Sequence, residues 1–252
     1  GSETKIIDRI SLFGYTSLGF FVLSFLILLL KDLCMQIFGI FEHLFKSDYI
    51  ADNSKREFLK KSLSISVIGV SGVASIYGFH SSRKGPTIIE QKIELGGKLP
   101  SSFNGLTIAQ ISDLHVGPTI KKGYVENVVG KISRINPDLI VITGDLIDGS
   151  IKHLRNDLSP LADLSAPHGV YFVTGNHEYY SGVDYCLDHV DKLGITNLIN
   201  EHILITKNKE NIVLAGVTDF KAGYIKPSHN SSPSLALERA PKDLVRILLA
   251  HQ

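Results

Sequence analysis

The chain lacks the features of two classes of protein, which are domains held together by disulfides and strongly basic nucleic-acid binders. Its 252 residues include only two cysteines. Cys34 lies beside an apolar N-terminal region and Cys186 lies far away in the polar part, so a disulfide framework is not expected. The formal net charge is only +1 at pH 7, which argues against a nucleic-acid binder held mainly by neutralising phosphates. We therefore expect no nucleic-acid partner.

The two ends of the chain also lack the features of natural ends. The only methionine is Met35, and the chain opens with Gly1-Ser2, so residue 1 is not expected to be a natural start. The last residues, His251 and Gln252, follow directly on the apolar, strand-like run 245–250. We expect the chain to be truncated at both ends.

Charge is missing altogether from residues 10–30, a run of 21 residues rich in Phe, Leu and Ile that ends at Lys31-Asp32. A helix of this length measures about 30 Å, the thickness of the hydrocarbon core of a bilayer. The alternative is a buried helix of a soluble protein, which would usually carry a polar stripe. We expect a membrane-spanning helix. Residues 33–45 either extend it or lie in the membrane interface.

A second uncharged stretch covers residues 62–79 and is flanked by basic residues on both sides. Its many Ser and Gly residues suit close contact between helices in lipid. The alternation of polar and apolar residues at its start leaves a strand or a linker as the alternative. We favour a second span. The basic residues of the connection place it on the cytoplasmic side, so the chain after residue 80 is expected to be extracytoplasmic at the cell membrane; they are Lys46, Lys55, Arg56, Lys60 and Lys61.

Beyond the membrane-anchoring region 1–84 and a linker 85–104, residues 105–252 read as an α/β domain in which strands alternate with helices. Apolar runs predict strands at 106–112, 138–142, 170–173, 203–206, 211–217 and 245–250. Apolar residues at helical spacing predict helices within 125–135, 154–164 and 183–193. Strands alternating with helices imply sheet layers covered by helices.

Polar residues follow four of these strands at the point where each strand ends. They are Asp113 and His115, the pair Gly144-Asp145, the run Gly175-Asn176-His177-Glu178, and His251. Each alone is an ordinary turn or a helix cap, but as an ordered set they offer the oxygen and nitrogen ligands that bind divalent metals. We expect them to converge on one edge of the sheet.

In order and spacing these blocks resemble the calcineurin-like metallophosphoesterase superfamily over residues 105–252. The runs 175–180 and 248–252 are most similar to its membrane-attached bacterial branch. The resemblance implies a four-layer αββα sandwich and two divalent metal ions, Mn, Fe or Zn. It also implies that Asp113 and His115 bind the first metal, Asp145 bridges both, and Asn176 and His251 bind the second.

The resemblance further implies that His177 lies beside the phosphate without binding metal, so that it can protonate the leaving oxygen. Asp148 and Glu178 are candidate supporting groups. Asp219 could also support the metal ligands, but a surface turn is favoured for it, and the remaining histidines are given no role. The final Gly-His-x-His block of the family would supply one more ligand to each metal and would lie beyond Gln252. The chain as given is therefore expected to be a poor enzyme.

The function implied is metal-dependent hydrolysis of phosphomono- or diesters beside a lipid bilayer. Some members of the membrane-attached branch are linked to a lipid-linked pyrophosphate, UDP-2,3-diacylglucosamine, and a bilayer anchor suits such a substrate. Two alternatives belong to other classes. One is a non-catalytic membrane scaffold with a phosphoesterase-like domain, and the other is an unrelated metal-binding receptor domain.

Overall fold

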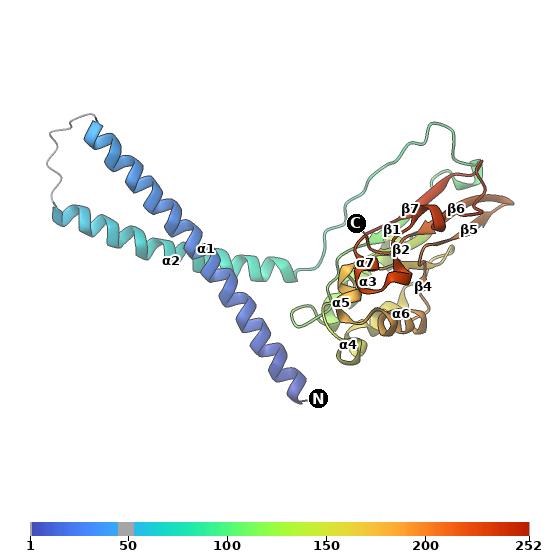
Figure 1. The fold of residues 1–252 in the computed structure, drawn as a ribbon, viewed down its shortest axis with the longest axis horizontal. Coiled ribbons are helices and arrows are strands. Elements are labelled where there is room, and N and C mark those ends of the chain that lie inside the picture. Colours follow the sequence, from blue (N-terminus) through green and yellow to red (C-terminus); the bar gives the residue numbers. More distant parts are fainter. Residues whose placement is uncertain (1, 45–52, 252) are drawn as a thin grey trace. The chain divides into compact units, whose positions relative to one another are not determined.

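The computed structural model describes residues 2–44 and 53–251. The chain divides into two compact units, Gly1–Lys84 and Gly85–Gln252, each with its own internal packing. Figure 1 shows the long helices of the first unit and the sheets and shorter helices of the second.

The first unit consists of α1 (Ser2–Leu44) and α2 (Asn53–Arg83). Because α1 continues without a break to Leu44, the apolar residues from 33 onward extend the first helix. Residues 62–79 are part of the helix α2, as the favoured second span requires, and do not form the alternative strand or linker. Two segments, Ile6–Phe41 and Lys60–Arg83, are long and apolar enough to cross a membrane. The most apolar window of α1 has none of its residues buried, unlike the core helix of a soluble protein.

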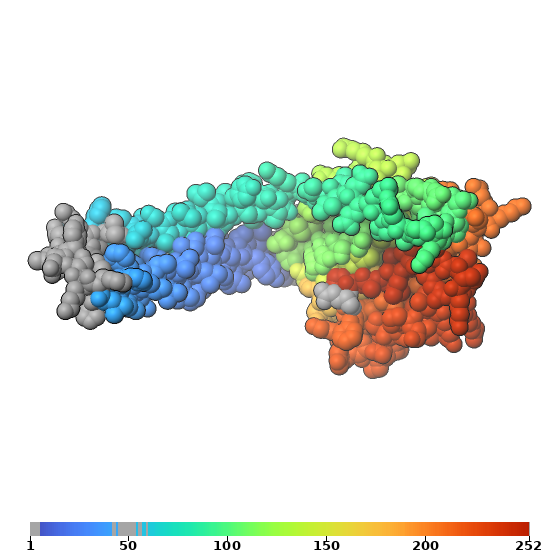
Figure 2. All heavy atoms as spheres, turned by 90° about the horizontal axis from the view of Figure 1, so that it is seen from above, coloured from blue at the N-terminus to red at the C-terminus, as the bar shows by residue number. Residues whose placement is uncertain are grey.

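The two helices of the first unit lie side by side over part of their length (Figure 2). The Lys31 ammonium donates to the Ser64 hydroxyl at 3.1 Å and pairs with the Asp32 carboxylate at 3.0 Å. Ser71 of α2 is fully buried, and small residues of this kind allow helix backbones to approach closely in lipid.

The first sheet of the second unit is parallel. Its strands lie in the order β1 (Ile108–Ile111), β2 (Leu139–Thr143), β3 (Val170–Val173) and β4 (Thr196–Asn197). The strand order follows the chain order, so right-handed connections all fall on the same face of this sheet. That face is covered by α3 (Lys122–Ile135), α4 (Ile151–Leu158) and α6 (Val183–Lys192). The opposite face stays free for a second layer of strands.

The second sheet is mixed and contains β5 (Glu201–Lys207), β6 (Glu210–Gly216) and β7 (Arg246–Leu249). β5 and β6 form an antiparallel hairpin, and β7 returns parallel to β6. The remaining short elements are η1 (Ser101–Phe103), η2 (Ser159–Asp163), α5 (Asn176–Ser181), α7 (Ala222–Ile225), η3 (Pro227–His229) and α8 (Pro233–Ala236).

The alternation of side chains along the strands builds the layers. In β2, Ile140 and Ile142 pack against the helices, whereas Leu139 and Val141 pack against the second sheet. Along β6 the same alternation directs some side chains to the space between the sheets and others outward, beneath α8. The order helix, sheet, sheet, helix confirms the expected four-layer α/β sandwich.

Local sequence explains the helix that precedes β2. Val125, Val128, Val129 and Ile132 recur at helical spacing in α3 and are all buried. The helix ends where Asn136 adopts a left-handed conformation with φ 50°, just before Pro137, which disfavours helix in the residue preceding it. The chain then enters β2 directly after this helix end.

Candidate metal centre

The loops that follow β1 and β2 run side by side and continue the parallel pairing of the strands. The His115 N–H donates to the Asp145 carbonyl at 2.9 Å, and the Asp113 N–H donates to the Gly144 carbonyl at 3.2 Å. Farther along, the Asp148 N–H donates back to the Val116 carbonyl at 2.8 Å. These bonds bring Asp113 and His115 next to Asp145.

Three predicted ligands have backbones in the left-handed region, where residues other than glycine are uncommon. Their φ angles are 56° for Asp113, 47° for His115 and 51° for Asp145. Such conformations cost of order 1–3 kcal/mol each and persist only where surrounding contacts hold them. The hydrogen bonds between the two loops supply those contacts, and strain of this kind is concentrated at functional sites.

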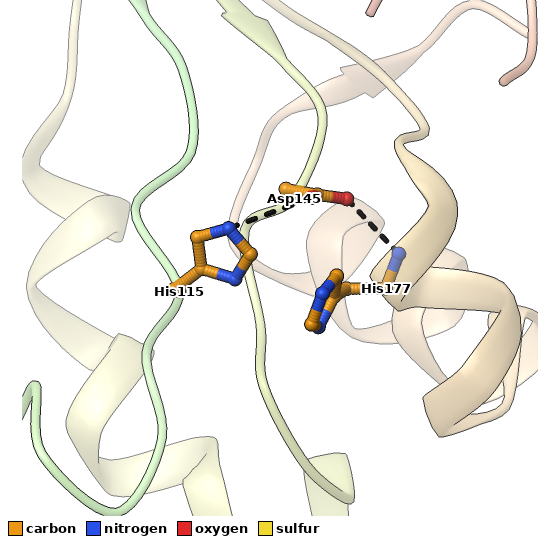
Figure 3. A group of neighbouring side chains, drawn as sticks. All are labelled: His115, Asp145 and His177. Carbon is orange, nitrogen blue, oxygen red and sulfur yellow. Dashed lines mark hydrogen bonds and ion pairs between the residues drawn. The ribbon is translucent and has the colours of Figure 1, made fainter. Parts of the chain in front are cut away.

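Two groups of side chains present their ligand atoms to common points. One is Asp113, Asp145 and His251, and the other is His115, Asp145 and His177; within each group the ligand atoms all lie within 4.8 Å of one another. Asp145 belongs to both groups and is 4% exposed. Figure 3 shows His115, Asp145 and His177 converging from the loops after β1 and β2 and from the start of α5.

The distances between these donors fit coordination by a common ion. The Nε2 atoms of His115 and His251 each lie 3.4 Å from Asp145 Oδ2, longer than the usual N–H···O hydrogen bond of about 2.7–3.2 Å. Two ligands about 2.1 Å from one metal, at a tetrahedral angle, are separated by about 3.4 Å. The donor set and its spacing therefore fit a divalent metal site.

The orientation of His251 fixes which of its nitrogens is available. Its Nδ1 lies 2.8 Å from the Thr143 carbonyl oxygen, which can only accept a hydrogen bond. The proton is therefore on Nδ1, and in the neutral ring Nε2 keeps its lone pair on the side of Asp145. A ligating histidine held through its other nitrogen is the usual arrangement at protein metal sites.

His251 reaches the site from the end of β7, in the second sheet, whereas the other residues follow strands of the first sheet. The expectation that all these strand ends share one sheet edge was therefore wrong. The ligands converge because the two sheets pack face to face, with the carboxyl ends of β2 and β7 on the same side.

His177 is placed at the site by two contacts. Its backbone N–H donates to Asp145 Oδ1 at 2.9 Å, and its ring Nδ1 lies 3.3 Å from Asp148 Oδ1. The His177 ring also packs edge-on against the His115 ring, with centroids 4.5 Å apart. Its side chain therefore lies among the converging ligand atoms, with Nε2 as the ring nitrogen not directed at Asp148.

Glu178 organises the loop that carries Asp145. Its carboxylate is fully buried, and one oxygen accepts from the N–H of Gly175 at 2.6 Å and of Asp145 at 3.1 Å. The other oxygen accepts from the N–H of Leu146 at 2.8 Å and of Ile147 at 3.4 Å. Burial raises the pKa of Glu178, opposed in part by these donors. The acidic residue after Asn176-His177 was the only sequence signal for this role.

Two glycines allow the loops to approach closely. A Cβ atom on Gly175 would lie 2.5 Å from the Asp145 backbone nitrogen. A Cβ atom on Gly144, where φ is 79°, would lie 2.5 Å from the Gly175 nitrogen and 2.8 Å from the His251 ring. Any larger residue at either position would push Asp145 or His251 out of place.

Asn176 is the first residue of α5 and lines a cleft together with Asp219, Phe220 and Lys221. Asp219 is only 3% exposed, so its expected place in a surface turn was wrong. The segment after β6 folds inward, and the Asp219 N–H lies 3.4 Å from the Thr174 hydroxyl. Asp219 thus contributes to the wall of the site.

Comparison with known proteins agrees with this geometry. Residues 106–252 match the model of the calcineurin-like phosphoesterases. The chain belongs to this family. That confirms the metallophosphoesterase family and fold expected from the sequence.

Three relatives illustrate the range of similar proteins. A zebrafish (Danio rerio) transmembrane protein with metallophosphoesterase domain is 34% identical over 73% of this chain and 43% of its own length. An uncharacterized Helicobacter pylori metallophosphoesterase is 33% identical over 96% of this chain and 61% of its own. The UDP-2,3-diacylglucosamine pyrophosphatase LpxG of Chlamydia muridarum is 37% identical, over 34% of this chain and 27% of its own. The chain thus spans about half the length of the first two.

Proposed function

We propose that this phosphoesterase hydrolyses phosphate esters with two divalent metal ions while α1 and α2 hold it at a membrane. The observation that carries the proposal is the position of Asp145, whose carboxylate belongs to both groups of converging ligand atoms. A carboxylate shared in this way suits a residue that bridges two metals.

The proposed ligands are Asp113 and His115 for one metal and Asn176 and His251 for the other, with Asp145 between them. When bound, two such metals lower the pKa of a water and neutralise the phosphate, with Mn, Fe and Zn all compatible with these donors. The chain's own contribution is orientation. Thr143 holds the His251 ring, and Glu178 holds the backbone of Asp145.

We assign His177 to proton transfer. Asp148 holds its Nδ1 side, so Nε2 is the atom available to donate a proton to the leaving oxygen of a substrate. His177 also belongs to one of the two groups that could hold a metal, so its role as proton donor or ligand has to be separated by experiment.

For the substrate we propose an ester or pyrophosphate attached to a lipid, such as UDP-2,3-diacylglucosamine, which the name of the Chlamydia relative supports. Relatives named as transmembrane proteins and the two candidate spans support the membrane setting. The basic connection between the spans supports an extracytoplasmic catalytic domain. Protease accessibility in membrane vesicles of known orientation tests on which side of the membrane the catalytic domain lies.

The decisive experiment compares Asp145→Asn with Asp188→Asn in the protein at its natural length. Asp188 lies on the surface of α6 and pairs with Lys192, so its neutralisation should have little effect. We expect wild type and Asp188→Asn to bind metal and hydrolyse bis-p-nitrophenyl phosphate, and Asp145→Asn to show background turnover. Near-normal turnover of Asp145→Asn with full metal content contradicts the bridging role. A metal-loaded wild type without turnover favours the scaffold alternative.

A further inference from the structure

The segment after β6 places exposed apolar side chains beside the candidate metal centre. Phe220 is 68% exposed, and Tyr224 and Ile225 of α7 are 84% and 51% exposed. We call these three residues the apolar rim. Phe220 belongs both to this rim and to the cleft that Asn176 lines.

The rim is held firmly from beneath. Between its members, Ala222 is fully buried in a small cluster with Tyr179 and Val183. The Tyr179 hydroxyl lies 3.0 Å from His229 Nδ1, at the far end of the segment, and the Thr218 hydroxyl donates to the His229 carbonyl at 2.8 Å. The exposed apolar side chains are therefore presented on an anchored scaffold.

Further contacts close the same segment onto α6 and the second sheet. The Lys226 ammonium pairs with the Asp184 carboxylate of α6. The Asn200 amide, just before β5, donates to the Asn230 carbonyl at 2.9 Å. With both ends fixed, the rim cannot withdraw its three side chains into the core without breaking these bonds.

We propose that the apolar rim receives the hydrocarbon chain of the substrate. The substrates of this site are then amphiphilic phosphate esters, with the phosphate at Asp145 and the acyl chain passing over Phe220 to Tyr224 and Ile225. The inference rests on the proposed function and extends it by assigning the residues that select a lipid.

Two observations favour an acyl chain over a protein partner. Three side chains offer much less area than the roughly 800 Å² that each partner contributes to a stable protein interface, whereas they suffice for one hydrocarbon chain. Moreover, the same chain carries two helices able to cross a membrane, so lipid is present at high local concentration. Lys221, exposed at the cleft beside Phe220, adds a positive charge where an anionic headgroup would pass.

A direct binding test uses the absence of tryptophan from this sequence. Phe220→Trp provides a single reporter on the rim, and Leu204→Trp, on the exposed side of β5, provides the matched control. Both variants of the full chain are placed in nanodiscs and titrated with dihexanoyl phosphatidic acid or with glycerol phosphate. We expect a saturable blue shift of the indole emission in Phe220→Trp with the lipid alone, and no shift in the control. Equal responses of the two reporters, or no response of the rim reporter, overturn the proposal.

A kinetic test asks whether the rim selects lipids. In the double variant Tyr224→Ser, Ile225→Ser, which keeps the cleft residue Phe220, we compare kcat/KM for dihexanoyl phosphatidic acid with kcat/KM for glycerol phosphate, which has no acyl chain. The ratio of the first to the second should fall about 10- to 100-fold relative to wild type, from the apolar burial that the variant removes. Equal losses on both substrates, or none on either, overturn the rim's role. A wild-type protein at its natural length that hydrolyses neither substrate refutes the proposed function, and the fluorescence titration then still decides whether the rim binds lipid.

Discussion

Replacing Glu178 by Gln tests how the Asp145 loop is held. The substitution keeps the size and shape of the side chain but exchanges one oxygen for an NH2 group. Glu178 accepts four backbone N–H groups, two on each oxygen. In the variant, the NH2 group must face two of these donors, and neither can be satisfied.

The size of the effect follows from these contacts. A buried N–H left without an acceptor costs about 1–3 kcal/mol. The least costly orientation of the introduced amide turns its NH2 group to Leu146 and Ile147, because the Ile147 bond is already long at 3.4 Å. We therefore expect the variant to lose about 2–5 kcal/mol of folding free energy. For a domain of this size that is a fall in Tm of roughly 5–15 °C.

The assay is thermal unfolding of the full chain in nanodiscs, combined with amide hydrogen exchange of the loop 144–148. Glu126→Gln is the matched control, because Glu126 lies on the surface of α3 and its ion-pair partner, Lys122, is 3.9 Å away. It should change Tm by no more than about 1–2 °C. An unchanged Tm together with unchanged exchange in Glu178→Gln would refute our account of the loop. Lost activity at an unchanged Tm would indicate that Glu178 takes part in the reaction itself and does not only hold the Asp145 loop.

The remaining predictions concern His177, Asp138 and the membrane helices. His177→Ala should lower kcat by roughly 10²–10⁴ while metal content stays the same, as measured by metal analysis beside kinetics; if metal is lost and kcat per bound metal is unchanged, His177 is a ligand. The Thr107 N–H and hydroxyl hold the pKa of Asp138 below its usual value, so the Asp138 carboxylate stabilises the fold above that usual pKa, and this stability is lost as pH falls through the folded-state pKa. Asp138→Asn should therefore lower Tm at pH 7, and the gap to wild type should narrow as pH falls below the usual pKa of an Asp carboxyl; a constant gap across pH would contradict this. The chain should remain with membranes after alkaline carbonate extraction, whereas recovery in the soluble fraction without detergent would exclude spanning helices.

The repeating local patterns of the sequence determined most of the elements. Helical spacing of apolar residues located α3, α4 and α6, and the apolar runs located β1, β2 and β3 together with β5, β6 and β7. These patterns are informative because a buried face imposes a fixed period on neighbouring residues. The two-residue β4 and the short helices α5, α7 and α8 are too brief to show a period, and none was foreseen.

The predicted site residues came from two different sources. Their positions after apolar runs followed from the sequence, but their roles as ligands or proton donor followed from resemblance to the family. The structure brings Asp113, His115, Asp145, His177 and His251 together, and it places Asn176 in the adjoining cleft. The assignment of each ligand to one metal stays a prediction.

Only the tertiary structure decided how these residues meet. That His251 arrives from a second sheet, that Asp219 is buried, and that Glu178 holds the Asp145 loop all depend on contacts between segments far apart in the chain. Local sequence encodes which face of a strand is apolar, because the alternation lies in adjacent residues. It does not encode which sheet packs against that face, since that choice depends on the fit of distant side chains in one core.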